Sequence, residues 1–195
     1  MKQIVVIHGG TTFPSYEDFL TNLKTSELNY ERLLASTDWK ATLKSHLPND
    51  DILLLSMPNK QNAKYEEWKI TFEKIIPFLQ NELILVGHSL GAIFLAKYLH
   101  ENRLPVVAKK VILVAAPYND ESDESLGDFK LISAAGIEQS AEEVHFFFSE
   151  DDPIVRIAER SKFIDDIPSA TFHTLKDRGH FWQEEFPEII ELIKK

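Results

Sequence analysis

The sequence contains no cysteine, and this absence excludes several kinds of site at once. A disulfide framework, a thiolate-bound zinc ion and a cysteine nucleophile all need the missing side chain. The absence is compatible with a reducing compartment, and we expect a cytoplasmic protein. Neither H-E-x-x-H nor a glycine-rich phosphate-binding pattern occurs in the chain. We therefore expect a chemistry that needs no metal and no cofactor.

Long apolar runs and dense basic runs are also missing. No stretch approaches the roughly 20 apolar residues that cross a bilayer. The net charge is −10, from 21 Lys and Arg against 31 Asp and Glu, and it would repel a polyanion such as DNA. We therefore expect neither a membrane nor a nucleic acid as partner. A chain of 195 residues, 44% of them hydrophobic, fits one domain over residues 1–195, which we take to be a monomer.

Six short apolar runs predict β-strands, and helical patterns separate them. The runs are residues 4–7, 52–55, 83–86, 111–114, 144–148 and 170–175. Most are continuously apolar, as expected for strands buried on both faces of a parallel sheet. The clearest helical patterns are residues 65–79, 90–101, 153–164 and 183–194. The alternation predicts an α/β fold with a doubly wound, mostly parallel six-stranded sheet flanked by helices.

Two stretches interrupt this alternation. Residues 21–47 are expected to hold one or two additional helices between the first strands. Residues 118–143 begin with an acidic run, residues 119–124, which predicts an exposed loop followed by a short excursion or cap. The role of both stretches is open at this stage.

The stretch Gly87-His88-Ser89-Leu90-Gly91 matches the G-x-S-x-G pattern of a nucleophile elbow. The pattern alone is weak, but here it follows an apolar strand and opens an apolar helix. An elbow requires this setting, because the turn is so sharp that side chains at the flanking glycines would clash. The serine then projects at the carboxyl end of the sheet, where open α/β folds bind ligands. We therefore predict that Ser89 is a nucleophile.

A serine hydroxyl is a poor nucleophile without a base, and the chain offers seven histidines. His180 lies in the turn between the last expected strand and the last expected helix, and this turn returns to the carboxyl edge beside the elbow. His88 adjoins Ser89, but side chains on either side of an elbow diverge. The others fall in the first loop, at helix ends or within strands: His8, His46, His100, His145 and His173. We therefore predict His180 as the base.

The base needs an acid that holds its tautomer and stabilises its charged form. Asp152 follows the fifth expected strand and stands directly before an expected helix start at Pro153. Asp151 is the close rival, because a shift of one residue swaps the directions of the two side chains. We predict Asp152 as the acid. The resulting chain order, Ser then Asp then His, is the order expected for this fold.

An acyl-transfer site also needs fixed donors for the tetrahedral oxyanion. The N–H of Leu90 follows the nucleophile and lies at a helix N-terminus, whose dipole favours negative charge. The second donor is expected from the loop after the first strand, His8-Gly9-Gly10-Thr11. We predict the N–H of Gly10, with that of Thr11 as the alternative.

These motifs resemble the small serine hydrolases of the retinoblastoma-binding protein 9 type, within the α/β-hydrolase superfamily. The resemblance covers nearly the whole chain at similar spacings, and its motifs are His8-Gly9-Gly10, Ser56-Met57-Pro58-Asn59, Glu66-Glu67-Trp68, the elbow, 149–155 and Gly179-His180-Phe181. It implies a compact α/β-hydrolase domain without a large lid, acting on esters through Ser89, Asp152 and His180. The chain departs from the family in a longer segment between Gly10 and Trp39, which would reshape the pocket mouth, and in Arg156, where many relatives have proline.

The leading hypothesis is a serine hydrolase that cleaves an ester, thioester or amide of a small acyl substrate through an acyl-enzyme. One alternative is a non-catalytic module that binds a protein partner on a hydrolase scaffold. Another is an acyltransferase, which would use the same residues with an acceptor other than water. Phe181 and Trp182 either line the pocket beside His180 or pack in the interior. The sequence leaves the physiological substrate and the acyl chain length open.

Overall fold

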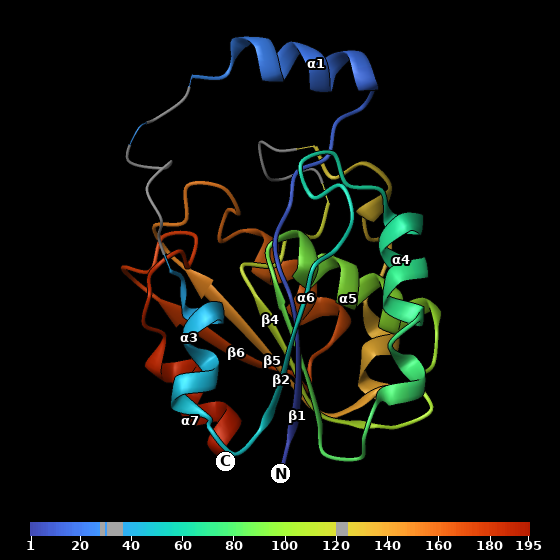
Figure 1. The fold of residues 1–195 in the computed structure, drawn as a ribbon, viewed down its shortest axis with the longest axis vertical. Coiled ribbons are helices and arrows are strands. Elements are labelled where there is room, and N and C mark those ends of the chain that lie inside the picture. The colour runs from blue at the N-terminus through green and yellow to red at the C-terminus, as the bar shows by residue number, and fades with distance from the viewer. Residues whose placement is uncertain (28–29, 31–36, 120–124) are drawn as a thin grey trace.

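The computed structural model describes residues 1–27, 30, 37–119 and 125–195, which form a six-stranded sheet with helices on both faces (Figure 1). The strands are β1 (Gln3–Ile7), β2 (Asp51–Leu55), β3 (Leu83–His88), β4 (Ala108–Val114), β5 (Ala141–Ser149) and β6 (Thr171–Leu175). The helices are α1 (Tyr16–Thr25), α3 (Trp39–His46), α4 (Tyr65–Glu73), α5 (Leu90–Glu101), α6 (Glu159–Asp166) and α7 (Pro187–Lys194). Among the described residues, no helix combines the length and the apolar character that a membrane crossing needs.

The strand order is β2-β1-β3-β4-β5-β6, and every neighbouring pair is parallel. The six predicted strands are confirmed, and the sheet is entirely rather than mostly parallel. Every residue of the central strands β1 and β3 is buried, whereas the edge strands β2 and β6 are only partly buried. The burial difference explains the sequence pattern, because a central strand needs apolar side chains on both faces and an edge strand does not.

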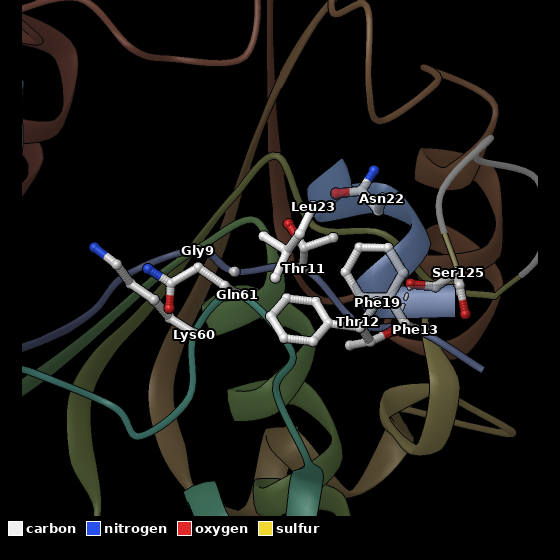
Figure 2. A pocket seen from close by; sticks show the side chains of 11 residues that line it. Gly9, Thr11, Thr12, Phe13, Phe19, Asn22, Leu23, Lys60, Gln61 and Ser125 are labelled. Carbon is white, nitrogen blue, oxygen red and sulfur yellow. Dashed lines mark hydrogen bonds between the residues drawn. The ribbon is translucent and has the colours of Figure 1, made fainter. Parts of the chain in front are cut away.

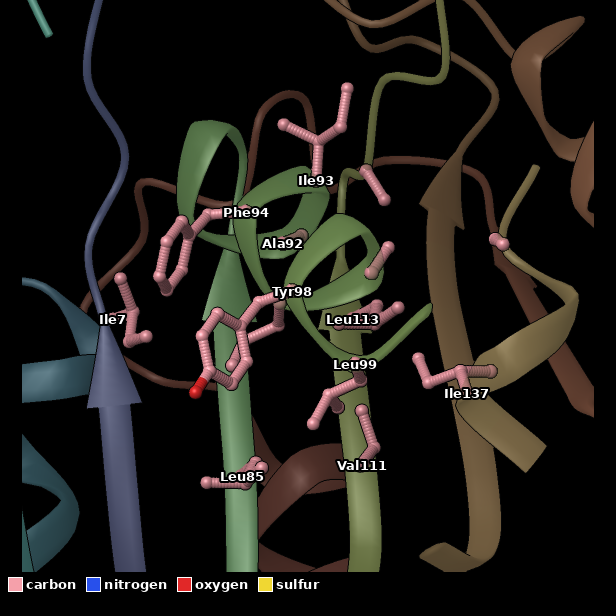
Figure 3. Packing of buried hydrophobic residues seen from close by; sticks show 14 of the residues in the cluster. Ile7, Leu85, Ala92, Ile93, Phe94, Tyr98, Leu99, Val111, Leu113 and Ile137 are labelled. Atoms are coloured by element: carbon pink, nitrogen blue, oxygen red, sulfur yellow. The ribbon is translucent and has the colours of Figure 1, made fainter. Parts of the chain in front are cut away.

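Helices cover the two faces of the sheet unequally. On one face α4, α5 and α6 contribute Trp68, Phe94 and Phe163 to a large apolar cluster, and on the other α3 and α7 contribute Trp39 and Ile189 to a smaller one. Figure 3 shows α5 lying over β3 and β4, with its apolar side chains against theirs. All residues of α5 except Lys97, His100 and Glu101 are buried, as expected for a helix enclosed by the sheet and its neighbours.

The strand order places a ligand crevice at one position in the sheet. The chain runs from β1 outward to β2 and then crosses back to β3 on the other side of β1. Connections leave β1 and β3 in opposite directions, and their carboxyl ends form the topological switch point at which open α/β sheets bind ligands. The loops after β1 and β3 carry residues 8–11 and 89, which are the predicted oxyanion loop and nucleophile.

Three of the predicted helices have different bounds in the structure. The helix predicted over 153–164 begins only at Glu159, so the prediction that Pro153 starts it is wrong. The helix predicted over 65–79 ends at Glu73, and a 3-10 turn with Pro77 follows, because proline lacks the N–H that continues a helix. The helix predicted over 183–194 starts at Pro187, a residue suited to a first helical turn.

The two interrupting stretches contain the helices α1 and α3 and two short 3-10 helices, Gly127–Phe129 and Ala135–Gln139. The prediction of one or two helices between the first strands is therefore confirmed. Helix α3 lies within residues 21–47, and α1 begins before residue 21 and ends within that stretch. The acidic loop predicted at 119–124 lies, beyond its first residue, outside the described residues, as do residues 28–29 and 31–36.

The position of His173 on β6 predicts a stability that depends on pH. His173 Nε2 lies 3.2 Å from His145 Nδ1, and the His173 ring stacks on Phe147 with centroids 4.3 Å apart. Burial is the main cause that lowers the pKa of His173, and the proximity of His145 lowers it further. The folded state therefore resists protonation more than the unfolded chain does. The stability is present above the unfolded pKa of 6.5 and is lost as the pH falls below it.

We expect His173→Phe to weaken this acid sensitivity while keeping the stacking on Phe147. Urea unfolding at pH 8 and pH 5 would measure the free energy of unfolding of both proteins. The difference in free energy of unfolding between the two proteins at pH 8 reports the change in packing. The loss of that free energy from pH 8 to pH 5, compared between the two proteins, reports the titration of His173. An equal loss of stability between pH 8 and pH 5 in both proteins would contradict the assignment to His173.

Candidate active site

The predicted nucleophile, Ser89, stands between the end of β3 and the first residue of α5. Its backbone has φ 54° and ψ −120°, a conformation that L-residues rarely adopt. A Cβ on Gly87 would lie 2.5 Å from the Gly91 carbonyl oxygen, and a Cβ on Gly91 would lie 2.4 Å from that of Ile7. The Ser89 N–H donates to the Val114 carbonyl at 2.8 Å and so fixes the turn to β4. The glycines therefore permit a turn that other residues would block.

His180 and Asp152 lie side by side on the loops that follow β6 and β5. The Nδ1 of His180 is 2.9 Å from Oδ2 of Asp152 and 3.0 Å from Oδ1. Both side chains are buried, with 3% and 2% of their surface exposed. Oδ1 of Asp152 also accepts hydrogen bonds from the N–H groups of Ile154 at 2.8 Å and Val155 at 2.9 Å. The carboxylate is thereby held where it can orient the imidazole.

The neighbouring carboxylate, Asp151, has other partners. Its Oδ1 accepts from the Ser149 hydroxyl at 2.5 Å and from the Gly179 N–H at 3.0 Å. The Ser149 oxygen in turn accepts from the Arg178 N–H at 3.0 Å. The hydrogen bond from Ser149 is the main cause that holds the pKa of Asp151 below its usual value. Asp151 therefore ties the loop before His180 to the end of β5, whereas its neighbour faces the imidazole.

Ser89 and His180 line one cavity of about 300 Å³, which we call the Ser89 cavity. Trp182 also lines it, with its ring centroid 5.3 Å from that of His180, whereas Phe181 is fully buried in the smaller apolar cluster. In the part of the chain that the structure describes, the Ser89 hydroxyl makes no hydrogen bond to His180. Such contacts between nucleophile and base are often long before a substrate binds.

The loop after β1 passes close to the elbow. A Cβ on Gly9 would lie 3.1 Å from the Cβ of Ser89, and a Cβ on Gly10 would lie 2.7 Å from the Lys60 carbonyl oxygen. The Thr11 N–H donates to that same carbonyl at 2.8 Å. Among the described residues, the Gly10 N–H has no hydrogen-bond partner. Of the two donors that the sequence left open, Gly10 is the one with an available N–H.

His8 fixes this loop through both of its ring nitrogens. The Met57 N–H donates to Nε2 of His8 at 2.9 Å, which assigns the ring proton to Nδ1. Nδ1 then donates to the Gly9 carbonyl at 2.6 Å. Burial is the main cause that lowers the pKa of His8, so the neutral ring is favoured. Sequence reasoning set His8 aside as a loop residue, because its partner at Met57 lies 49 positions away in the chain.

A family model described as serine hydrolase matches residues 34–193. The chain belongs to the serine hydrolase family. The enzyme is 28% identical to serine hydrolase RBBP9 of Rattus norvegicus over 158 residues, which cover 76% of this chain and 78% of the rat protein. The resemblance to the retinoblastoma-binding protein 9 type is thereby confirmed. Gly10 lies before the matched residues, and the other predicted site residues lie within them.

Solved structures share the fold of the enzyme. The ydeN gene product from B. subtilis has a TM-score of 0.76 at 22% identity, covering 100% of this chain and 97% of that one. The methylesterase MES16 from Arabidopsis has a TM-score of 0.63 at 10% identity, covering 100% and 98%. The thioesterase domain from the curacin biosynthetic pathway has a TM-score of 0.63 at 11% identity, covering 100% and 91%. The predicted α/β-hydrolase fold is confirmed.

His88 is a site residue of this hydrolase that sequence reasoning did not assign. Its Nε2 lies 2.8 Å from the His180 carbonyl oxygen, and the two ring centroids are 5.0 Å apart. Burial, followed by the nearby Lys40 cation, holds the pKa of His88 well below its usual value. The ring is therefore neutral and donates from Nε2–H, which fixes the backbone of His180. Only the contact across 92 positions reveals this role.

The structure brings the five predicted site residues of the hydrolase to one edge of its sheet. Ser89 and Leu90 form the elbow, Gly10 lies against it, and His180 with its partner Asp152 adjoins the same cavity. Across the described ranges, no group of three or more histidine, aspartate or glutamate side chains is arranged to hold a metal ion.

Proposed function

We propose that this serine hydrolase cleaves a small carboxylic ester, with thioesters and amides as related substrates, by acyl transfer from Ser89 to water. The observation that carries the proposal is the contact of 2.9 Å between His180 and Asp152. Ser89, which has elbow geometry, lines the same cavity as His180. Asp152 accepts the Nδ1–H of His180, and the other ring nitrogen, Nε2, is then free to accept a proton.

The reaction proceeds through two proton transfers and an acyl-enzyme. Nε2 of His180 accepts the Ser89 proton as Oγ attacks the carbonyl carbon, and the imidazolium then gives that proton to the leaving group. Water attacks the resulting acyl-serine with the same imidazole as base, and the carboxylate product leaves. Asp152 orients the ring and stabilises its charged form throughout.

Two backbone donors stabilise the oxyanion. The Leu90 N–H belongs to the first turn of α5, where N–H groups have no partner within the helix and the dipole favours negative charge. The Gly10 N–H supplies the second hydrogen bond. His8 supports this donor, because its bonds to Met57 and Gly9 hold the loop in place. Loss of one such donor typically costs a factor of about 10² to 10³ in kcat.

The preference for esters rests on the site and on the fold neighbours. A volume of about 300 Å³ suits the reacting end of a small molecule. Among proteins with this fold, one is named a methylesterase and another a thioesterase. The partner that we propose is therefore a small acyl substrate.

We expect an alkyl fluorophosphonate probe to label the folded protein at Ser89 and nowhere else. Activation of the serine by His180 is the physical reason, because phosphonylation needs the same proton transfer as acylation. Peptide mapping by mass spectrometry would locate the adduct. Ser89→Ala should abolish labelling, whereas Ser161→Ala, a matched change on the surface helix α6, should leave it unchanged. A folded wild-type protein that is not labelled at Ser89 would refute the proposed function.

A further inference from the structure

A second cavity, of about 700 Å³, is lined by residues of α1 and of the loop after β1 (Figure 2), and it adjoins the Ser89 cavity. The two share residues 9–11 and Lys60 in their walls. A narrow recess is lined by Gly10, Ser89 and Ser125, and Ser125 also lines the larger cavity. The larger cavity, which we call the α1 cavity, therefore shares the oxyanion loop with both spaces that Ser89 lines.

Helix α1 and the chain before it supply the apolar wall of the α1 cavity. Phe13, Phe19 and Leu23 line it, and the two phenylalanine rings have centroids 5.4 Å apart (Figure 2). Asn22, Lys60 and other polar residues form the remaining wall. The helix has only ten residues and none of them is fully buried. The stability of a helix this short depends on the packing of its apolar face. In α1, part of that face lines the α1 cavity instead of packing against protein.

The direction of proton transfer decides which part of a substrate this cavity receives. His180 gives its proton to the leaving group, so the leaving group lies beside His180 and Trp182 in the Ser89 cavity. Within the described residues, neither of these side chains lines the α1 cavity. The acyl group of a substrate whose carbonyl oxygen sits at Gly10 and Leu90 extends away from the leaving group. The α1 cavity borders the oxyanion loop that holds this oxygen, so it can receive the acyl group.

We propose that the α1 cavity binds the acyl group of the substrate, and that Phe19 and Leu23 select apolar acyl groups of medium length. This inference rests on the hydrolysis proposed above. The volume falls in the range of sites that enclose whole small ligands. Helix α1 precedes residues 34–193, which the family model matches, so this selectivity belongs to a segment outside that match.

The test is the hydrolysis of p-nitrophenyl esters from acetate to octanoate, which share one leaving group. Burial of each added methylene is worth up to about fourfold in binding, so the four methylenes added from acetate to hexanoate set a limit of about 250-fold. Because burial in an open cavity is incomplete, we expect kcat/KM of the wild type to rise by about 50-fold. The double variant Phe19→Ser and Leu23→Ser should lose about tenfold or more for hexanoate, mainly through KM, and less than about twofold for acetate. Lys24→Ser, on the exposed side of the same helix, is the matched control.

Binding of octanoate to Ser89→Ala protein supplies a readout that does not depend on turnover. Calorimetry should show that the Phe19→Ser and Leu23→Ser changes weaken octanoate binding at least about tenfold in this background, and that Lys24→Ser does not. A flat chain-length profile, or octanoate binding unchanged by the double variant, would overturn the acyl assignment. Such a result would leave the proposed function intact if Ser89 is still labelled by the probe, and unlabelled Ser89 would overturn the proposed function instead.

Discussion

Asparagine in place of Asp152 is expected to lower kcat for an ester by about 10³- to 10⁴-fold, because an amide can present its N–H₂ group to the imidazole and favour the wrong tautomer. The geometry makes this variant informative. Oδ1 of Asp152 accepts from the N–H groups of Ile154 and Val155, and the carbonyl oxygen of asparagine can accept both bonds. The fold should therefore persist while the orientation of His180 is lost.

Asp151→Asn is the matched control, one residue away and with the same change of charge. Asp151 contacts Ser149 and Gly179 and does not face the imidazole, so we expect its replacement to lower kcat by less than about tenfold. Steady-state hydrolysis of p-nitrophenyl acetate, with circular dichroism to verify folding, measures both variants. Equal losses, or a larger loss for Asp151→Asn, would mean that the acid of the site is assigned to the wrong residue.

The strands and the elbow could be predicted because their causes are local in the sequence. Continuous apolar runs at residues 4–7 and 83–86 mark strands that are buried on both faces, and these are β1 and β3 of the structure. Gly87 and Gly91 could be interpreted in the same way, because the turn between a strand and a helix requires small residues at fixed positions. The order of the loops after the strands then placed the candidate residues at one edge.

Features that depend on distant contacts could not be predicted. The start of α6 at Glu159 was not indicated by the sequence, because Asp152 and Pro153 form the pattern of a helix N-terminus, and in the structure Asp152 accepts from the N–H groups of Ile154 and Val155 as an N-cap would. The sequence predicted Gly10 and kept Thr11 as the alternative, because the Lys60 carbonyl that accepts the Thr11 N–H lies about 50 positions later in the chain.

The roles of His8 and His88 were missed for the same reason. Each is a neutral imidazole that fixes the backbone of the site. His8 contacts a residue 49 positions away in the chain, and His88 contacts one 92 positions away. A histidine beside a glycine loop or an elbow carries no local pattern that separates a positioning role from packing. The α1 cavity is likewise a property of the space between elements, and only the unusual length of the segment before Trp39 indicated a changed pocket mouth.

Alanine in place of Gly91 is expected to lower the free energy of unfolding by about 3 kcal/mol or more, and a complete failure to fold is compatible with this expectation. Two effects oppose each other at this position. Gly91 lies inside α5, where alanine is favoured over glycine by about 1 kcal/mol. Against this gain, a Cβ would lie 2.4 Å from the Ile7 carbonyl oxygen and 2.6 Å from that of His8. Both atoms belong to backbone, so relief requires separating α5 from β1.

Gly179→Ala is the comparison that separates a clash from ordinary backbone strain. Gly179 has φ 49°, and a Cβ there would meet no atom within 4 Å. Alanine at Gly179 should therefore cost only the left-handed conformation, about 1 to 2 kcal/mol. Urea unfolding measures both variants, with thermal melts for protein that folds too weakly for titration. If Gly91→Ala is as stable as Gly179→Ala, the close approach of α5 to β1 does not constrain the elbow, and Ser89 owes its position to other contacts.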